Sequence, residues 1–267
     1  MMNKFSLKDN CVCNDEKPLQ NLVEGYSFTS IFRTIAFIGD SLSSGEFEVR
    51  HSDGSSTYHD MYEYSWGQFI ARKNGIKAYN FSRGGMTAKW YMESFAQEEG
   101  FFSKELACQA YVIALAENDL VCQNMELGSI NDINPDDYYK NKKTFAGYYA
   151  QIISRYKEIS PDAKFFLVSL PNVMRSDGFR EKAEGMLSLL KDFEGHFDNT
   201  YVIDLYNHGI CYDDVFRKTY YYNGHLNPMG YVYTAKIIDS YIDYIIRHNP
   251  DDFKEVGFIN SGIEYKK

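Results

Sequence analysis

The sequence contains few cysteines, no long apolar run and fewer basic than acidic residues, and each shortage excludes a class of protein. Its five cysteines are odd in number and scattered over 267 residues, so no disulfide framework is expected. No stretch reaches the roughly 18 uninterrupted apolar residues of a membrane-spanning helix. The first 17 residues turn polar before the apolar core of a signal peptide forms. Together these absences predict a cytoplasmic protein.

The charge balance and the missing motifs argue against several partners. There are 28 basic and 37 acidic residues, and the net charge of -9 disfavours nucleic acid and an anionic membrane surface as partners. The chain has neither a GxGxxG nor a Walker sequence, so nucleotide binding is disfavoured as well. Cys11 and Cys13 form a close pair but lack a second pair at ligand spacing. No metal and no other cofactor is therefore expected, and a role for this cysteine pair stays open.

Apolar segments that alternate with helical patterns predict the fold class. Five short segments rich in strand-forming residues are expected to be strands, at 34–39, 77–81, 110–116, 165–170 and 201–205. Amphipathic segments are expected to be helices, from about residue 65 and at 87–97, 138–159, 179–193 and 228–247. This alternation predicts one α/β domain over residues 34–267, a flavodoxin-like three-layer α/β/α sandwich with a mostly parallel five-stranded sheet.

Two segments outside this alternation carry expectations of their own. Residues 1–33 are expected to form an N-terminal arm, and partial alternation over residues 21–32 is compatible with an edge strand or a hairpin. Residues 51–60, HSDGSSTYHD, are polar and contain a glycine, which predicts a loop. Because this loop lies between the first strand and the first helix, we expect it near the mouth of any pocket there.

Ser41 lies where the first predicted strand ends. Gly39 and Asp40 break the apolar run, and the small residues up to Gly45 leave room around the Ser41 hydroxyl. In a parallel α/β sheet, ligands bind beyond the carboxyl ends of the strands. A serine after a strand is more often a turn or N-cap residue than a nucleophile, so Ser41 needs partners at the same edge.

Three other segments are expected to supply such partners. Gly84 and Gly85 follow the second predicted strand, Asn118 follows the third, and His225 lies just before the last helix. Acyl transfer needs a serine that attacks and a histidine that takes its proton. It also needs amide donors that stabilise the negative oxygen of the tetrahedral intermediate.

These segments resemble the motif blocks of the SGNH hydrolases, also called the GDSL esterases and lipases. The blocks stand in the family's order, as GDSLS at 39–43, NFSRGG at 80–85, AEND at 116–119 and HLNP at 225–228. Ala116 replaces the glycine that usually begins the third block. Each block alone is a weak signal, but four in register cover the chain from about residue 34 to 247.

The resemblance implies a role for each matching residue. Ser41 would be the nucleophile, and His225 would be the general base and then the acid that protonates the leaving group. The backbone N–H groups of Ser41 and Gly85, together with the Asn118 side chain, would form the oxyanion hole. The resemblance also implies a metal-independent reaction on a small-molecule ester, such as an acylated carbohydrate.

The third member of the triad is missing from its usual position. The family places an aspartate three residues before the histidine, where this chain has Tyr222, and the nearer Asn223 is neutral and out of register. An acid from elsewhere stays open, with three candidates that precede His225, namely Asp204, Asp213 and Asp214. We expect instead a neutral acceptor, most simply a backbone carbonyl of the loop 216–222, and an imidazole pKa near the ordinary value of about 6.5.

The sequence therefore predicts a serine ester hydrolase that releases small acyl groups, such as acetate, from a carbohydrate or another small ester. Two alternatives stay open: a ligand-binding protein that keeps the SGNH fold without catalysis, and a lipase or thioesterase for longer acyl chains. The α/β-hydrolase class fits less well, because Ser43 stands where the nucleophile elbow needs its last glycine. The acyl length, the alcohol and the oligomeric state stay open.

Overall fold

A parallel five-stranded sheet forms the centre of the protein, in a computed structural model that describes residues 15–174 and 177–263. The strands are ordered β4-β1-β5-β6-β7, and every neighbouring pair is parallel. They span Thr34–Gly39 (β1), Lys77–Ser82 (β4), Ala110–Ala114 (β5), Lys164–Val168 (β6) and Thr200–Ile203 (β7). The carboxyl ends of all five strands therefore lie at one edge of the sheet.

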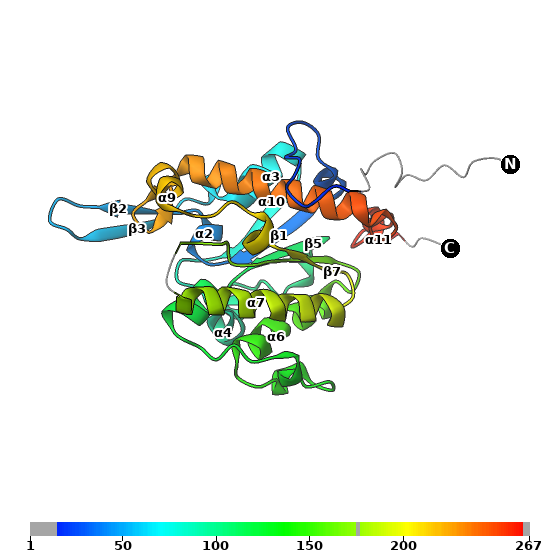
Figure 1. Cartoon of the computed structure of the whole chain (residues 1–267). Helices are drawn as coiled ribbons and strands as arrows, with labels where there is room; N and C mark the ends of the chain where they lie inside the picture. Colours follow the sequence, from blue (N-terminus) through cyan, green and yellow to red (C-terminus); the bar gives the residue numbers. More distant parts are fainter. Residues whose placement is uncertain (1–14, 175–176, 264–267) are drawn as a thin grey trace.

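Helices cover both faces of the sheet (Figure 1). One face carries α3 and α10, and the other carries α6 and α7, with bounds Trp66–Asn74, Pro228–His248, Phe145–Ile159 and Asp177–His196. Phe37 of β1 packs against Trp66 on the first side, whereas its neighbour Ile38 belongs to the apolar cluster on the second side. A strand buried on both faces needs apolar residues at every position, which explains the unbroken apolar runs.

This architecture confirms the predicted α/β/α sandwich with its parallel five-stranded sheet, and the strand ends differ from the prediction by at most two residues. Two helix predictions are less accurate. The helix expected from residue 138 begins at Phe145, because the Thr144 side chain caps it by accepting a hydrogen bond from the Gly147 N–H. The helix expected over 87–97 is divided into Ala88–Trp90 (α4), a π-helical turn Tyr91–Phe95 (η3) and Ala96–Glu98 (α5).

The loop predicted over residues 51–60 is confirmed for residues 51–55, which form a turn, and wrong for residues 56–60, which form a strand. The chain forms an antiparallel hairpin of β2 (Glu46–Arg50) and β3 (Ser56–Asp60), which extends away from the body of the molecule (Figure 1). The strands were missed because their residues are mostly polar, so the apolar alternation that marks a half-buried strand is weak. The hairpin does start next to Ser41, so the predicted position near the mouth of the site is correct.

The edge strand or hairpin expected over residues 21–32 is also wrong. This segment, all of it described, contains no strand and ends in a 3₁₀ helix, Phe28–Ile31 (η1). Side-chain acceptors on α10 hold it, since Ser27 Oγ donates to Asp239 at 2.9 Å. These acceptors replace the backbone partners that a strand would need. The first 14 residues of the predicted arm lie outside the described part of the chain.

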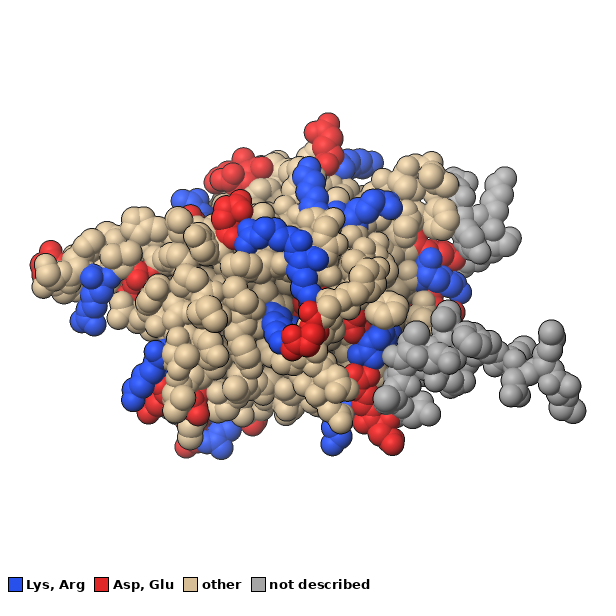
Figure 2. All heavy atoms as spheres, turned by 90° about the horizontal axis from the view of Figure 1, so that it is seen from above, with Lys and Arg blue, Asp and Glu red and all other residues tan. Residues whose placement is uncertain are grey.

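The remaining elements are short. They are α2 (Ser41–Ser44), η2 (Tyr62–Tyr64), η4 (Lys104–Leu106), η5 (Glu117–Cys122), η6 (Ile130–Asp132), η7 (Tyr138–Lys140), α8 (Leu205–His208), α9 (Asp214–Tyr220), β8 (Tyr221–Tyr222), β9 (His225–Leu226), α11 (Pro250–Phe253) and η8 (Val256–Phe258). Among the helices of the described residues, none combines the length and the apolar character that crossing a membrane requires. On the face that carries α3 and α10, basic and acidic side chains are interspersed (Figure 2).

Asp239 provides a test of how the N-terminal segment is held. Its buried carboxylate accepts from Ser27 and lies 2.8 Å from Lys73 Nζ. We expect Asp239→Ala to lower the free energy of unfolding by about 2–4 kcal/mol, because Ser27 and Lys73 lose a buried partner. Urea denaturation measures the change. Asp251→Ala, which breaks an exposed ion pair with Lys254, is the control and should leave stability nearly unchanged. Equal effects of the two variants would contradict the prediction.

Candidate active site

Ser41 is the first residue of α2, which directly follows the carboxyl end of β1. Asp40 caps this turn, because its side chain accepts a hydrogen bond from the Leu42 N–H at 3.1 Å. Burial raises the pKa of the Asp40 carboxyl to about 7, although the Leu42 N–H opposes the shift. The Ser41 N–H is one of the first amides of the turn and has no carbonyl partner within it.

The segment after β4 is tied to the turn that holds Ser41. Ser82 Oγ donates to the Phe37 carbonyl at 2.7 Å, and the Arg83 N–H donates to the Gly39 carbonyl at 3.4 Å. Gly85 has a φ of 72°, in the left-handed region that favours glycine. These contacts bring Gly85 to the same edge of the sheet as Ser41, as the sequence predicts.

Asn118 lies in η5, the π-helical segment after β5, and is tied to the segment after β4. Its side-chain Nδ2 donates to the Met86 carbonyl at 3.1 Å. The buried carboxylate of Asp119 accepts from the Ala88 N–H, with oxygens at 2.9 and 3.2 Å. Burial raises the pKa of Asp119 to about 7. The two predicted oxyanion donors, Gly85 and Asn118, therefore belong to segments joined by hydrogen bonds.

His225 is held between two carboxylates of the β2–β3 hairpin. Its Nε2 lies 3.0 Å from Glu46 Oε1, and its Nδ1 lies 3.4 Å from Glu48 Oε2. The histidine side chain is only 16% exposed, which limits solvent screening of these contacts. Burial alone would lower the pKa of His225, but hydrogen bonds with Glu46 and Glu48 outweigh it and raise the pKa above 6.5.

This geometry contradicts the neutral acceptor that the sequence led us to expect. Residues 216–220 belong to α9 rather than to a loop, and the ring nitrogens of His225 contact carboxylates. The same carboxylates raise the pKa of the imidazole above its ordinary value. The Tyr222 side chain is half exposed and packs edge-on against Phe47 instead of contacting the ring of His225.

The three aspartates considered as triad acids lie instead at the starts of short helices. Asp204 caps α8 and lies 3.5 Å from Lys191 Nζ, Asp213 caps α9, and Asp214 is exposed in the first turn of α9. Sequence reasoning missed Glu46 and Glu48. The available signal was their spacing of two, because alternate residues of a strand share one face.

Ser41 and His225 lie on neighbouring elements, since α2 packs against β9. No hydrogen bond joins the two side chains, both of which belong to the described residues, because the contact at Nε2 is made by Glu46. A Cβ added to Gly84 would collide with the Glu46 carboxylate. Glu46 therefore lies between the histidine ring and the segment that holds Gly85.

Aromatic side chains surround this part of the hairpin. Tyr58 of β3 packs edge-on against the His225 ring at 5.6 Å and is 56% exposed. On the other face of β2, Phe47 stacks on Tyr231 of α10 at 5.9 Å. Phe47 thus attaches the hairpin to the domain, and Tyr58 places an exposed ring beside His225.

A small, mostly apolar cavity lies beside the turn that holds Ser41. Its volume is about 100 Å³, and its lining includes Asp40, Leu42, Ala116 and Leu226. These residues are sequence neighbours of Ser41, Asn118 and His225, which do not themselves line the cavity. The cavity is smaller than an apolar cavity of about 150 Å³, which admits benzene.

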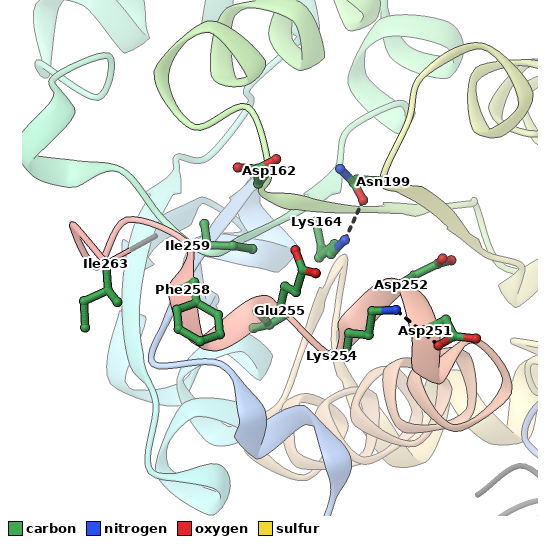
Figure 3. A pocket seen from close by; sticks show the side chains of 11 residues that line it. Asp162, Lys164, Asn199, Asp251, Asp252, Lys254, Glu255, Phe258, Ile259 and Ile263 are labelled. Carbon is green, nitrogen blue, oxygen red and sulfur yellow. Dashed lines mark hydrogen bonds and ion pairs between the residues drawn. The ribbon is translucent and has the colours of Figure 1, made fainter. Parts of the chain in front are cut away.

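A larger hollow lies at the opposite edge of the sheet (Figure 3). It has a volume of about 710 Å³ and is lined mainly by polar and charged side chains, among them Lys164 and Asn199. Lys164 begins β6 and Asn199 directly precedes β7, so the hollow opens at the amino ends of the strands. It lies at the edge of the sheet opposite to Ser41 and is therefore not the candidate active site. Within residues 15–174 and 177–263, no cluster of His, Cys, Asp and Glu side chains is arranged to hold a metal ion.

Comparison with known proteins identifies a matching family. The sequence model described as GDSL-like Lipase/Acylhydrolase matches residues 35–249, which include Ser41, Gly85, Asn118 and His225. No curated protein sequence matches the chain.

Solved structures with a similar fold include carbohydrate esterases. A family two carbohydrate esterase from Clostridium thermocellum, solved with cellohexaose, is 17% identical with a TM-score of 0.55, covering 89% of this chain and 66% of that one. A family 2 enzyme from Corynascus thermopiles is 14% identical with a TM-score of 0.53, covering 80% and 66%. A family 3 esterase from Clostridium thermocellum is 14% identical with a TM-score of 0.52, covering 80% and 96%. The chain spans about two thirds of the length of the two family 2 enzymes, and at these identities the likeness concerns the fold.

The two carboxylates around His225 predict how the ring titrates. We expect its NMR titration midpoint in the folded protein to lie above 6.5, because the carboxylates stabilise the charged ring. The ring then contributes stability that is fully present below the unfolded-state pKa and is lost as the pH rises through the folded-state pKa. The same resonance in urea-unfolded protein is the control. A folded-state midpoint at or below the unfolded one would contradict the prediction.

Proposed function

Because this chain belongs to the GDSL-like lipase/acylhydrolase family, we propose that it is a serine ester hydrolase that releases small acyl groups, such as acetate, from a carbohydrate or another small ester. The observation that carries the proposal is the meeting of four segments at one edge of the sheet. The segments that hold Ser41, Gly85 and Asn118 are joined by hydrogen bonds, and β9 with His225 packs against α2.

The reaction would begin with attack of Ser41 Oγ on the ester carbonyl. The Ser41 proton passes to His225 Nε2, which must first exchange its contact with Glu46 for one with Ser41. The ester C–O bond then breaks, and His225 returns the proton to the departing alcohol. Water, deprotonated by His225, then attacks the acyl-serine. The bond between the acyl carbon and Ser41 Oγ breaks, the acid is released, and His225 returns the proton to Ser41. No metal or other cofactor takes part in this scheme.

The negative oxygen of the tetrahedral intermediate would be bound by three donors. Two are the backbone N–H groups of Ser41 and Gly85, and the third is the Asn118 side chain. Asn118 Nδ2 carries two hydrogens, and one of them is directed to the Met86 carbonyl. The second hydrogen is available to the intermediate, and the bond to Met86 fixes the amide that provides it.

Two observations support the substrate class. The cavity of about 100 Å³ beside Ser41 suits an acetyl group better than a long acyl chain, which argues against the lipase and thioesterase alternatives. The carbohydrate part is supported by the exposed Tyr58 ring beside His225, because sugars stack on aromatic faces. It is also supported by the carbohydrate esterases among the structural neighbours. A cytoplasmic location and the absence of nucleic acid and membrane partners stay predictions from the sequence.

A ligand-binding protein without turnover is the second candidate. The contact between Glu46 and His225 Nε2 favours it, because a charged ring held in this way cannot accept the Ser41 proton. Turnover of p-nitrophenyl acetate by the wild-type protein, lost in Ser41→Ala, would separate the hydrolase from this alternative.

Removal of the proposed nucleophile is the first test. We expect Ser41→Ala to lower kcat for p-nitrophenyl acetate by about 10⁴-fold or more, because the attacking oxygen is lost. Ser52→Ala, on the exposed turn of the hairpin, is the matched control and should keep the wild-type kcat. An organophosphonate adduct that maps to another serine would overturn the assignment.

Removal of the side-chain oxyanion donor is the second test. We expect Asn118→Ala to lower kcat by about 10²–10³ with little change in KM, because this donor acts mainly in the transition state. Steady-state kinetics on the same ester measure both constants, with the exposed Gln123→Ala as control. An unchanged kcat would mean that Asn118 only ties η5 to the segment after β4.

A further inference from the structure

We propose that Glu48 of the β2–β3 hairpin is the acid that orients His225, in place of the aspartate that the family usually carries three residues before its histidine. The inference rests on the proposed function and adds a positioning residue to it. Glu48 precedes His225 by 177 residues, so the two meet only in the folded protein. The family's usual position is occupied by Tyr222, whose side chain packs on Phe47.

The Glu48 carboxylate is itself held in place on both oxygens. Its Oε1 accepts from Ser56 Oγ at 3.0 Å, and its Oε2 accepts from the Gly224 N–H at 2.9 Å. The same Oε2 lies 3.4 Å from His225 Nδ1. Since Gly224 directly precedes His225, one carboxylate fixes both the backbone and the ring of the histidine.

Hydrogen bonds keep Glu48 ionised although it is largely buried. Burial tends to raise its pKa, but hydrogen bonds from Gly224, Ser56 and His225 outweigh this and lower it. The side chain is only 12% exposed, so water competes little for the carboxylate. An ionised, immobilised acid on Nδ1 leaves Nε2 as the nitrogen that takes the serine proton, which is the division of roles that a triad needs.

The hairpin is attached to the domain in a way that fixes this carboxylate. In β2, Glu46 and Glu48 share one face, and Phe47 between them points to the other and stacks on Tyr231. The Tyr231 hydroxyl donates to the Glu46 carbonyl at 2.7 Å. Because Tyr231 is a buried residue of α10, the position of β2 is coupled to the core.

Glu46 does not fit the same role. It contacts Nε2, the nitrogen that must face Ser41, and it lies against Gly84 on the side where the ester would bind. An orienting acid binds the opposite nitrogen and stays there throughout the reaction. Glu46 therefore has to leave Nε2 before turnover, whereas Glu48 stays on Nδ1.

The charged and titratable groups that face His225 come from three elements. They are Glu46 and Glu48 on β2, Tyr58 on β3 and Asp40 at the start of α2. Glu48 is distinguished from the others by its contact with Nδ1. Its removal should therefore change both the orientation and the charge of the ring.

Glu48→Gln tests the proposal, because it keeps the shape of the side chain and removes the charge. We expect kcat for p-nitrophenyl acetate to fall by about 10²–10⁴-fold with KM within about threefold, as for loss of a triad acid. The acid limb of the kcat/KM profile should move to lower pH, because His225 loses a stabilising charge. Glu48→Asp should recover part of the lost kcat. Asp53→Asn, at the exposed turn of the same hairpin, is the control and should match the wild type.

Three results would decide against Glu48. The proposal is overturned if Glu48→Gln keeps the wild-type kcat and pH profile. It is also overturned if Glu46→Gln, and not Glu48→Gln, moves the acid limb to lower pH and lowers kcat. It is overturned as well if Glu48→Gln and Asp53→Asn lower kcat equally.

If Glu48→Gln does not fold, Ser56→Ala replaces it, because this variant removes the donor to Oε1 and keeps the charge. A loss of about two- to tenfold in kcat is then expected, and no loss contradicts the proposal.

If the proposed hydrolase function is wrong, the results differ from those expected if only the role of Glu48 is wrong. The wild-type protein would then show no turnover that depends on Ser41, and kinetics would say nothing about Glu48. NMR titration of His225 still tests the contact, because it needs no substrate. A lower midpoint in Glu48→Gln than in wild type and Asp53→Asn supports the orienting role, and equal midpoints in all three overturn it.

Discussion

All five strands of the sheet run in the same direction, so the chain leaves every strand at the same edge. This constraint determines where Ser41, Gly85 and Asn118 lie, because each follows a different strand. The hydrogen bonds between Asn118 and Met86 and between Asp119 and Ala88 then lock the segments after β4 and β5 together. A site built in this way takes its precision from the sheet rather than from the loops themselves.

The histidine depends on a second constraint, the packing of the β2–β3 hairpin on the domain. Two carboxylates around one imidazole favour the imidazolium, which is the form that His225 would take after accepting a proton from Ser41. The same charges raise the pKa of the resting ring and so reduce the fraction that can act as a base. The carboxylates that would stabilise the imidazolium formed in the reaction therefore also reduce the amount of neutral His225 that could start it. Displacement of Glu46 by a substrate would ease this conflict, because it removes one charge and frees Nε2.

The similarity to carbohydrate esterases concerns the fold, whereas the residues around His225 concern the chemistry of the site. At identities of 14–17%, the solved structures share the fold of this chain, and a fold alone does not define a reaction. The family match adds that residues 35–249, which contain the serine, glycine, asparagine and histidine segments, fit the sequence model of GDSL-like acylhydrolases. In this chain, the β2–β3 hairpin brings Glu46, Glu48 and Tyr58 to the histidine.

The sequence by itself determined the sheet and three of the four segments of the site. Strands buried on both faces require unbroken apolar runs, and the polar residues that follow such runs meet at one edge when the strands are parallel. The partners of His225 were decided only by the tertiary structure. Glu48 lies 177 residues earlier, on a polar strand without a clear apolar pattern, and its contact depends on Phe47 packing against Tyr231. A local pattern can indicate that a strand forms, but packing between distant segments determines which side chain reaches the histidine.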